Sequence, residues 1–223
     1  MTRNAFERDL RGLKDDVVGL GHRAGQAVQR AVMAVRQRNL DEAERVIADD
    51  SAIDAVHLSL EERCMRLLAL QQPMARDLRT IASVFAITID LERMADHAEG
   101  ISRAVKRLAE TTLPASLIPV LDRHLPQAAD IVQEMLRDGL RAFETGDVDL
   151  ARRVARRDDE VDGLRSQVFQ EALAAMMEGR TAVPAALELL LSIQHLERAA
   201  DHITNIAERV VYMVTGELPI LNE

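Results

Sequence analysis

The segment Leu91-Glu92-Arg93-Met94-Ala95-Asp96-His97 recurs as Leu196-Glu197-Arg198-Ala199-Ala200-Asp201-His202, with six of the seven positions identical. Each copy places a Glu and an Asp four residues apart. On a helix this spacing puts both carboxylates on one face, with their Cβ atoms about 5–6 Å apart. Two like charges this close repel each other, so a chain that builds the pair twice indicates a positive group between them. We therefore predict a duplicated carboxylate metal site.

The composition favours a helical protein with a core of small aliphatic side chains. The 223 residues include four Phe, one Tyr and no Trp, and Gly and Pro are sparse. This length suits one large domain or two small ones, and folding buries roughly 70% of the unfolded surface of such a chain. The net charge of −9 argues against nucleic-acid binding, which needs a clustered basic footprint. It suits a protein that binds cations.

The sequence also predicts a cytoplasmic location. The first residues are charged and lack the apolar core of a signal peptide. The longest uncharged run, residues 111–121, is far shorter than the roughly 20 residues of a membrane-spanning helix, so no transmembrane segment is expected. The single cysteine, Cys64, cannot form an internal disulfide and is interpreted as a buried thiol. We expect the protein in the cytoplasm, peripheral to the inner face of the membrane through its partners.

Hydrophobic periodicity predicts six long helices, at about residues 4–38, 40–70, 75–110, 119–145, 148–178 and 185–215. Residues 71–73 break the second helix, because a proline disfavours helix in the residue before it. Gly146 and Asp147 predict a turn and a cap, and Gly216 predicts the end of the last helix. Four glycines in the first helix predict close packing against a neighbouring helix, or a bend; they are Gly12, Gly19, Gly21 and Gly25.

The helical pattern of the first half recurs in the second. Five positions match at an offset of 108 residues: Leu40, Ala43, Val46, Ile53 and Asp54 with Val148, Ala151, Val154, Val161 and Asp162. We therefore predict an all-α fold of two tandem, pseudo-symmetric three-helix bundles. The first repeat spans residues 1–111 and the second spans 112–223, with the linker at residues 111–115.

The middle helix of each repeat carries a second pair of acids four residues apart. Along an antiparallel helix pair, residues that face each other have numbers with a constant sum, and the acids of each repeat meet this condition. The four carboxylates of a repeat are therefore predicted to lie at one level, where they interrupt apolar stripes. The eight predicted metal ligands are Asp50, Asp54, Glu92 and Asp96 in the first repeat and Asp158, Asp162, Glu197 and Asp201 in the second.

Ligands that offer only oxygen suit hard cations, namely Mg²⁺, Mn²⁺, Ca²⁺ or iron; Zn²⁺ is kept as a further candidate, and the identity stays open. Ion pairing of the acids with Arg93 and Arg198 on a solvated face is the alternative. His97 and His202 lie one step off the acid stripe and are interpreted as polar or packing residues rather than ligands. The arginines 152, 153, 156 and 157 are interpreted as solvated surface, with a docking patch for an acidic partner as the alternative.

The repeated signature resembles that of the PhoU family of phosphate-transport regulators. Further matches are Gln72-Pro73-x-Ala75-x-Asp77-Leu78-Arg79, Asp201-His202-x-Thr204-Asn205-Ile206-Ala207-Glu208 and Tyr212-Met213-Val214-x-Gly216. The resemblance covers nearly the whole chain and implies metal ions, often clustered, at the two Glu-x-x-x-Asp motifs. The acids of the two middle helices are partners inferred from helix-pair geometry alone. After His97 the first copy departs from the second, so we expect the two sites to differ in occupancy or metal.

The resemblance also implies an adaptor without enzymatic activity. Such proteins couple the phosphate ABC transporter, through its ATPase subunit, to the sensor histidine kinase of the phosphate regulon, and they restrain uptake when phosphate is plentiful. A homodimer is expected, because long apolar-faced helices pair readily. The alternatives are a metal-free helical scaffold, a histidine phosphotransfer module and a ferritin-like metalloenzyme. The last requires Glu-x-x-His pairs, and no Glu here has a His three residues on.

Overall fold

The computed structural model describes residues 3–70 and 73–221, and every regular element within them is a helix. The elements are α1 (Arg3–Gln37), α2 (Leu40–Leu70), α3 (Ala75–Ala109), η1 (Ala115–Leu117), η2 (Val120–His124), α4 (Leu125–Thr145), α5 (Val148–Ala155), α6 (Asp158–Glu178), η3 (Arg180–Ala182) and α7 (Val183–Thr215). This confirms the predicted all-α class with six long helices. The predicted break at Gln71 and Gln72 lies outside the described residues.

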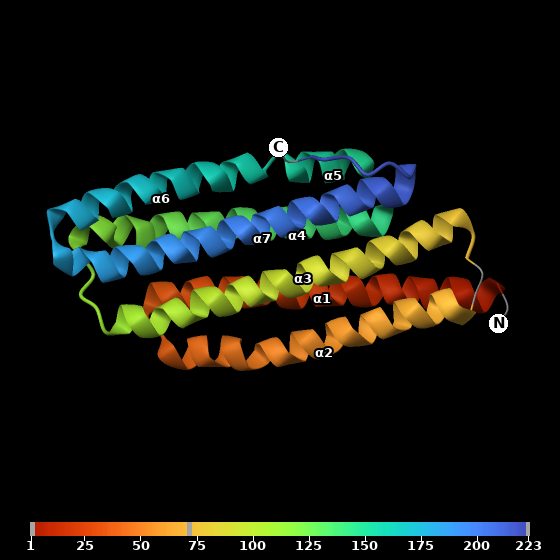
Figure 1. The fold of residues 1–223 in the computed structure, drawn as a ribbon, viewed down its shortest axis with the longest axis horizontal. Coiled ribbons are helices and arrows are strands. Elements are labelled where there is room, and N and C mark those ends of the chain that lie inside the picture. The colour runs from red at the N-terminus through yellow and green to blue at the C-terminus, as the bar shows by residue number, and fades with distance from the viewer. Residues whose placement is uncertain (1–2, 71–72, 222–223) are drawn as a thin grey trace.

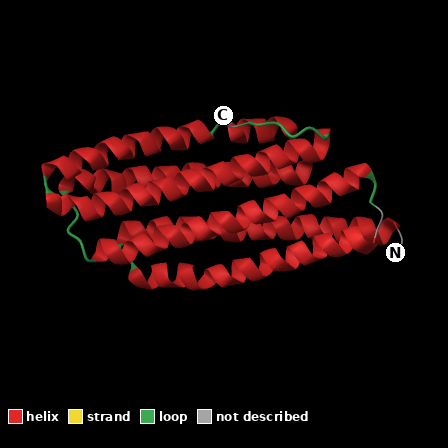
Figure 2. Cartoon of the chain, viewed as in Figure 1, coloured by secondary structure: helices red, strands yellow, loops and turns green. Residues whose placement is uncertain are grey.

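The long helices run side by side along the longest axis of the molecule (Figure 1). Helices α1, α2 and α3 form one bundle, and α4, α7 and the α5–α6 pair form the other. The bundles meet where α3 packs on α7 and α1 packs on α4. Loops are confined to the helix ends (Figure 2). Because α3 and α7 carry the two signature segments, the fold brings both copies to the junction of the bundles.

Local capping explains where the helices end. Gly146 adopts a left-handed φ of 70°, and the Asp147 carboxylate accepts a hydrogen bond of 2.9 Å from the Leu150 N–H at the start of α5. Gly216 closes α7 with a φ of 84°. A side chain strains this backbone conformation, which is why glycine serves there. The predicted turn, cap and helix end at these positions are confirmed.

Two of the four glycines in α1 let α4 approach closely. A Cβ on Gly21 would lie 2.7 Å from the Leu140 methyl carbons, and one on Gly25 would lie 2.7 Å from Leu136 Cδ2. Gly19, by contrast, has nothing within 4 Å. The prediction of close packing is therefore confirmed at Gly21 and Gly25, and the contact they make is one of the two that join the bundles.

The predicted helix at residues 148–178 is wrong as a single element. Helix α5 ends at Ala155, a turn occupies residues 156–157, and α6 begins at Asp158. In the turn, the Arg157 N–H bonds to the Val154 carbonyl at 3.0 Å, one residue short of the α-helical spacing. The predicted helix at 119–145 also starts differently, with the π-helical turn η2 before α4. Pro126 follows that turn and lacks the N–H that a regular helix would use there.

The core is built from aliphatic side chains of all the long helices. Cys64 is fully buried, as predicted, and burial raises the pKa of its thiol to about 11. Among the described residues, no helix combines the length and the apolar character that a membrane span requires.

Candidate functional site

The first set of predicted carboxylates comes together between α2 and α3. Asp50 and Asp54 of α2, with Glu92 and Asp96 of α3, are all half-buried. Burial, followed by the charges of Asp54, Asp96, Glu99 and Glu92, raises the pKa of Asp50 to about 6. Burial and Asp96 likewise raise the pKa of Glu92. The four acids predicted to share one level therefore lie close enough to oppose one another's ionisation.

The structure adds Glu99 and His57, which the sequence reasoning missed, to this set, and it places Arg93 in the ion pairs that were named as the alternative. Glu99 belongs to it, and its position seven residues after Glu92 on the same helical face was the available signal. Arg93 Nη1 lies 2.8 Å from Asp96 Oδ2, and Arg93 Nε lies 3.4 Å from Glu92 Oε2. His57 of α2 also faces Glu92 and lowers its pKa slightly against the larger effect of burial. Arg93 and His57 thus partly neutralise the negative charge of this set.

The second set lies between α6 and α7. Burial and the Asp201 charge raise the pKa of Glu197, while burial and the Asp162 charge raise the pKa of Asp201. Arg165, which the sequence reasoning missed, lies between two of them: its Nε is 3.5 Å from Asp162 Oδ1 and 3.7 Å from Glu197 Oε1. Asp158 is the first residue of α6 and only 3% exposed. The arginine that neutralises this set comes from a different helix than in the first.

The donor chemistry of both sets is that of a hard-cation site, because carboxylate oxygens dominate and their mutual repulsion favours a positive ligand. Over residues 3–70 and 73–221, however, no three or more His, Cys, Asp or Glu side chains are arranged to hold a metal ion. Arg93 and Arg165 bond to acids of the two sets instead. A cation would therefore displace an arginine as it draws the carboxylates inward.

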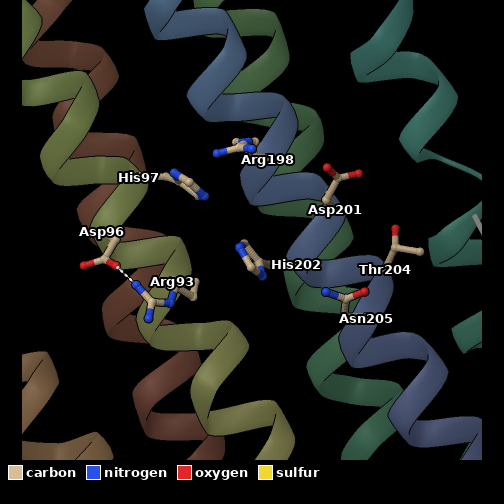
Figure 3. A pocket seen from close by; sticks show the side chains of 8 residues that line it. All are labelled: Arg93, Asp96, His97, Arg198, Asp201, His202, Thr204 and Asn205. Carbon is tan, nitrogen blue, oxygen red and sulfur yellow. Dashed lines mark hydrogen bonds and ion pairs between the residues drawn. The ribbon is translucent and has the colours of Figure 1, made fainter.

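Between the two carboxylate sets, α3 and α7 enclose an open cleft of about 620 Å³ (Figure 3). It is lined by Arg93, Asp96, His97, Arg198, Asp201, His202, Thr204 and Asn205. The imidazoles of His97 and His202 and the guanidinium of Arg198 reach into the space between the helices. Asp96 and Asp201 point away from the space between the two helices. The cleft therefore presents nitrogen-bearing groups between two flanks of carboxylate.

Three histidines meet at this cleft, and one of them, His195, was missed in the sequence. His97 Nδ1 lies 3.2 Å from His195 Nδ1, and the His97 ring stacks on the His202 ring with centroids 5.4 Å apart. His202 Nδ1 lies 2.9 Å from Asp90 Oδ1, which also accepts a 3.1 Å hydrogen bond from Asn205 Nδ2. The predicted packing role of His97 and His202 thus takes the form of contacts that cross between the repeats.

The Asp90–His202 and His195–His97 contacts lie at equivalent positions of the two repeats. The 105-residue offset that relates His97 to His202 also relates Asp90 to His195 and Gly100 to Asn205. One half of the cleft therefore has Asp90 bonded to His202, and the equivalent half has His195 beside His97. Gly100 provides the room, because a Cβ there would lie 2.4 Å from His195 Cε1. The same backbone arrangement holds a carboxylate–imidazole pair on one side and two imidazoles on the other.

Positive neighbours converge on His97. Burial, followed by His202, His195, Arg198 and Arg93, lowers the pKa of His97 to about 4. Burial, followed by Arg198, lowers the pKa of His195. Both rings are consequently neutral at pH 7, and their Nδ1–Nδ1 contact is a hydrogen bond in which one ring donates and the other accepts.

Comparison with known proteins places these features in a family. The family model described as the PhoU domain matches residues 17–105 and 125–210. The chain is 37% identical over 220 residues to the phosphate-specific transport system accessory protein PhoU homolog of Streptococcus pneumoniae serotype 4, covering 99% of this chain and 100% of that protein. It is 34% identical over 224 residues to the protein of the same name from Clostridium acetobutylicum, covering all of both.

Solved structures agree with the sequence relatives. The crystal structure of the phosphate transport system regulatory protein PhoU from Streptococcus pneumoniae superposes with a TM-score of 0.88 at 34% identity, covering 96% of this chain and 99% of that one. The crystal structure of PhoU from Pseudomonas aeruginosa gives a TM-score of 0.88 at 33% identity, covering 95% and 100%. The fold is therefore shared over nearly the whole chain.

Proposed function

Because this chain belongs to the PhoU family, we propose that it is an accessory protein of a phosphate-specific transport system that binds metal ions at its two carboxylate sets. The metal assignment depends on one observation: both repeats gather carboxylates that repel one another. Each repeat gathers half-buried acids whose pKa values burial and like charge raise, and each does so at the same signature. A chain maintains such repulsion most simply where a cation relieves it.

The residues proposed to hold metal are those predicted from the sequence. In the first repeat they are Asp50, Asp54, Glu92 and Asp96, with Glu99 added; in the second they are Asp158, Asp162, Glu197 and Asp201. Magnesium, manganese, calcium and iron suit such oxygen donors, and zinc is a further candidate. A bound ion would neutralise the acids and free Arg93 and Arg165 from their present ion pairs.

The regulatory role is that of an adaptor, not a catalyst. We propose that the protein contacts the ATPase subunit of the phosphate ABC transporter and the phosphate-sensing histidine kinase, and that it restrains uptake and regulon expression when phosphate is plentiful. It would act at the cytoplasmic face of the membrane through these partners, as a homodimer. The full-length likeness to accessory proteins of the phosphate-specific transport system supports the transporter contact.

Metal content and Mn²⁺ or Mg²⁺ affinity of the purified protein test the site assignment. The variant is Asp96→Asn/Asp201→Asn, which removes one acid from each set. The matched control is Asp49→Asn/Asp159→Asn, which removes the same charge at exposed neighbours of Asp50 and Asp158. We expect cation binding to weaken by at least about tenfold in the first variant and to change little in the control. Equal stoichiometry and affinity in all three proteins would refute the assignment.

The adaptor role needs its own test. Pull-down from cells grown with plentiful and with scarce phosphate should recover the transporter ATPase and the histidine kinase with the tagged protein, and light scattering should give the mass of a dimer. Recovery of neither partner in either condition would count against the role.

A metal-free interaction protein is the second candidate. The arginines that already bond to the acids in both sets favour it, because a neutralised face needs no cation. This reading expects no metal in the purified protein and an unchanged partner pull-down after chelation.

A further inference from the structure

We propose that the cleft between α3 and α7 binds a phosphoryl oxyanion, either inorganic phosphate or the phosphoryl group of a larger molecule. The proposal goes beyond the metal-bearing adaptor role and does not depend on it. Of the groups that would contact the anion, Arg198, His97 and Asn205 belong to neither carboxylate set, and only Arg93 also bonds to acids of the first set. The ligand would lie at the junction of the two repeats, against both signature segments.

Two arginines supply charged hydrogen-bond donors to the cleft. Arg198 is exposed, reaches into the cleft and makes no ion pair with any residue in the described part of the chain (Figure 3). Its planar guanidinium has five N–H donors in a fork that matches the oxygens of a phosphoryl group. Arg93 bonds to Asp96 and Glu92 at one end and keeps further donors on the same guanidinium. One arginine thus comes from each repeat.

The imidazoles and an amide supply the neutral donors. In the tautomer in which His195 donates in the Nδ1–Nδ1 contact, His97 carries its proton on Nε2 and can donate it to a ligand; this is the tautomer that the proposal requires. Asp90 accepts from Asn205 Nδ2 and pairs with His202 Nδ1, which orients both side chains where they line the cleft. The second N–H of the Asn205 amide stays available. Arg, His and Asn together form a donor set typical of phosphate recognition.

Electrostatics decides between an anion and a metal. Three clustered imidazoles would suit a transition metal, but Arg198 and Arg93 both face His97, and Arg198 also faces His195. A divalent cation among these side chains would be repelled by two guanidinium groups, whereas an anion would be attracted by both. Asp96 and Asp201 line the same cleft but point to its outer flanks, and Asp96 is already bonded to Arg93 (Figure 3). The inner part therefore favours negative charge.

The size of the cleft bears on the source of the phosphoryl group. Its volume of about 620 Å³ lies within the range of about 300–1,000 Å³ typical of sites for small organic molecules. This space exceeds what inorganic phosphate alone fills. It leaves room for ordered water beside a free phosphate, or for the remainder of a phosphomonoester or nucleotide, so the test must include both sources.

Calorimetric titration of the full chain, treated with chelator and at low salt, tests the proposal. Inorganic phosphate is one probe, and AMP is the probe for a larger phosphorylated molecule. The variant Arg198→Gln removes the guanidinium group and its charge. The variant Arg198→Lys keeps the positive charge but lacks the forked N–H donors of the guanidinium. The matched control is Arg103→Gln on α3, whose arginine pairs with Glu99 at 2.6 Å and does not line the cleft.

We expect saturable binding of one phosphate per chain, weakened at least about tenfold by Arg198→Gln, less by Arg198→Lys and little by the control. Saturable binding of AMP alone, with the same dependence, supports the site and assigns the source to a larger molecule. In both cases the imidazole NMR signals of His97 and His202 should shift on titration.

Three outcomes would overturn the proposal. They are an absence of binding by either probe at millimolar concentration, equal weakening in Arg198→Gln and Arg103→Gln, and binding that appears only when Mg²⁺ is restored. The last would place the phosphate on a carboxylate-bound metal. Because the titration uses chelated protein, failure of the metal assignment leaves this result unaffected, and a failed phosphate titration leaves the metal assignment standing.

Discussion

Asp50 is the residue where the crowding of acids is most directly measurable. Its folded-state pKa of about 6 lies above the ordinary value of 3.8, so the folded chain binds this proton more tightly than the unfolded chain does. Stability from this group is therefore present at low pH and is lost as the pH rises through about 6. Above that pH, the charged carboxylate destabilises the fold.

The variant Asp50→Asn should accordingly be more stable than the wild type at pH 7.5 in the presence of chelator. Because the side chain is only half-buried, solvent screening limits the gain to below about 1 kcal/mol. The gain should shrink below pH 6 and vanish near pH 4. Urea denaturation across this range measures it. The control Asp49→Asn loses an ion pair with Arg30 and should show no such gain; equal behaviour of the two variants would contradict the prediction.

Asp90 and His195 occupy equivalent positions in the two repeats, which allows a second prediction about single residues. In the variant His195→Asp, the ring beside His97 becomes a carboxylate, as in the other half of the cleft. We expect the pKa of His97 to rise well above its present value of about 4, because a negative charge replaces the His195 imidazole beside it. NMR titration of the His97 ring measures the shift. His195→Asn, which only removes the imidazole, should give a smaller rise, and an unchanged pKa in both would refute the account.

The sequence was sufficient to place acids together and to name Arg93 as a neutralising partner, but not to find Arg165 or His195. Helical spacing and the constant-sum rule put Asp50 with Asp96 and Asp162 with Glu197 because both rules act within one helix pair. His195 escaped notice because its counterpart, Asp90, is chemically unlike it, so comparison of the repeats for identity passes over the position. Its contact with His97 also joins two repeats, and no periodicity within either one encodes that.

At the scale of the elements, the α1–α4 contact makes a prediction with a built-in control. Gly21→Ala would bring a Cβ to 2.7 Å from Leu140 and should destabilise the fold by about 1–3 kcal/mol through overpacking. Gly19→Ala has open space and should stabilise by about 0.5–1 kcal/mol through helix propensity. Thermal and urea unfolding measure both. Opposite signs are expected, and a loss of stability in Gly19→Ala would contradict the packing explanation.

The sequence predicted helix boundaries correctly where a glycine or a capping residue marks them. Gly146, Asp147 and Gly216 were readable because their conformations and capping bonds are local. The break between α5 and α6 was not, because residues 156–157 are arginines with good helix propensity and the apolar period of the first repeat continues past them. In the structure, Arg157 of that turn pairs with Glu134 of α4 at 2.9 Å, a contact between helices that local propensity does not encode.

At the scale of the whole molecule, a partly buried ion pair between the half-exposed Arg107 and the buried Glu188 helps to link the bundles. Arg107 of α3 donates to Glu188 of α7 at 2.5 Å, and Glu188 is only 8% exposed. Arg107→Ala should destabilise the fold by about 1–3 kcal/mol, because it leaves a buried carboxylate without its partner.

Chemical denaturation measures this effect, and the exposed pair at Arg103 provides the comparison. Arg103→Ala should cost less than about 0.5 kcal/mol. The double variant Arg107→Leu/Glu188→Leu should recover most of the loss, because two apolar groups replace two charges. Equal effects of the two single variants would show that the Arg107 pair does not hold the bundles together.

Duplication predicted two bundles but not how they meet. The repeat pattern is the same whether the signature helices face each other or lie far apart, and only the small residues of α1 and the aliphatic faces of α3 and α7 decide it. Their packing turns two remote copies of one heptapeptide into the walls of a single cleft.

That cleft is symmetric in its backbone and unsymmetric in its chemistry. A chain with identical repeats would offer the same surface after a half-turn about the axis between them, and anything seated on the axis would bind equally well in either orientation. Asp90 opposite His202 and His195 opposite His97 remove this equivalence. A ligand or partner that lies across the junction therefore has one preferred direction, and the two bundles become a distinguishable head and tail.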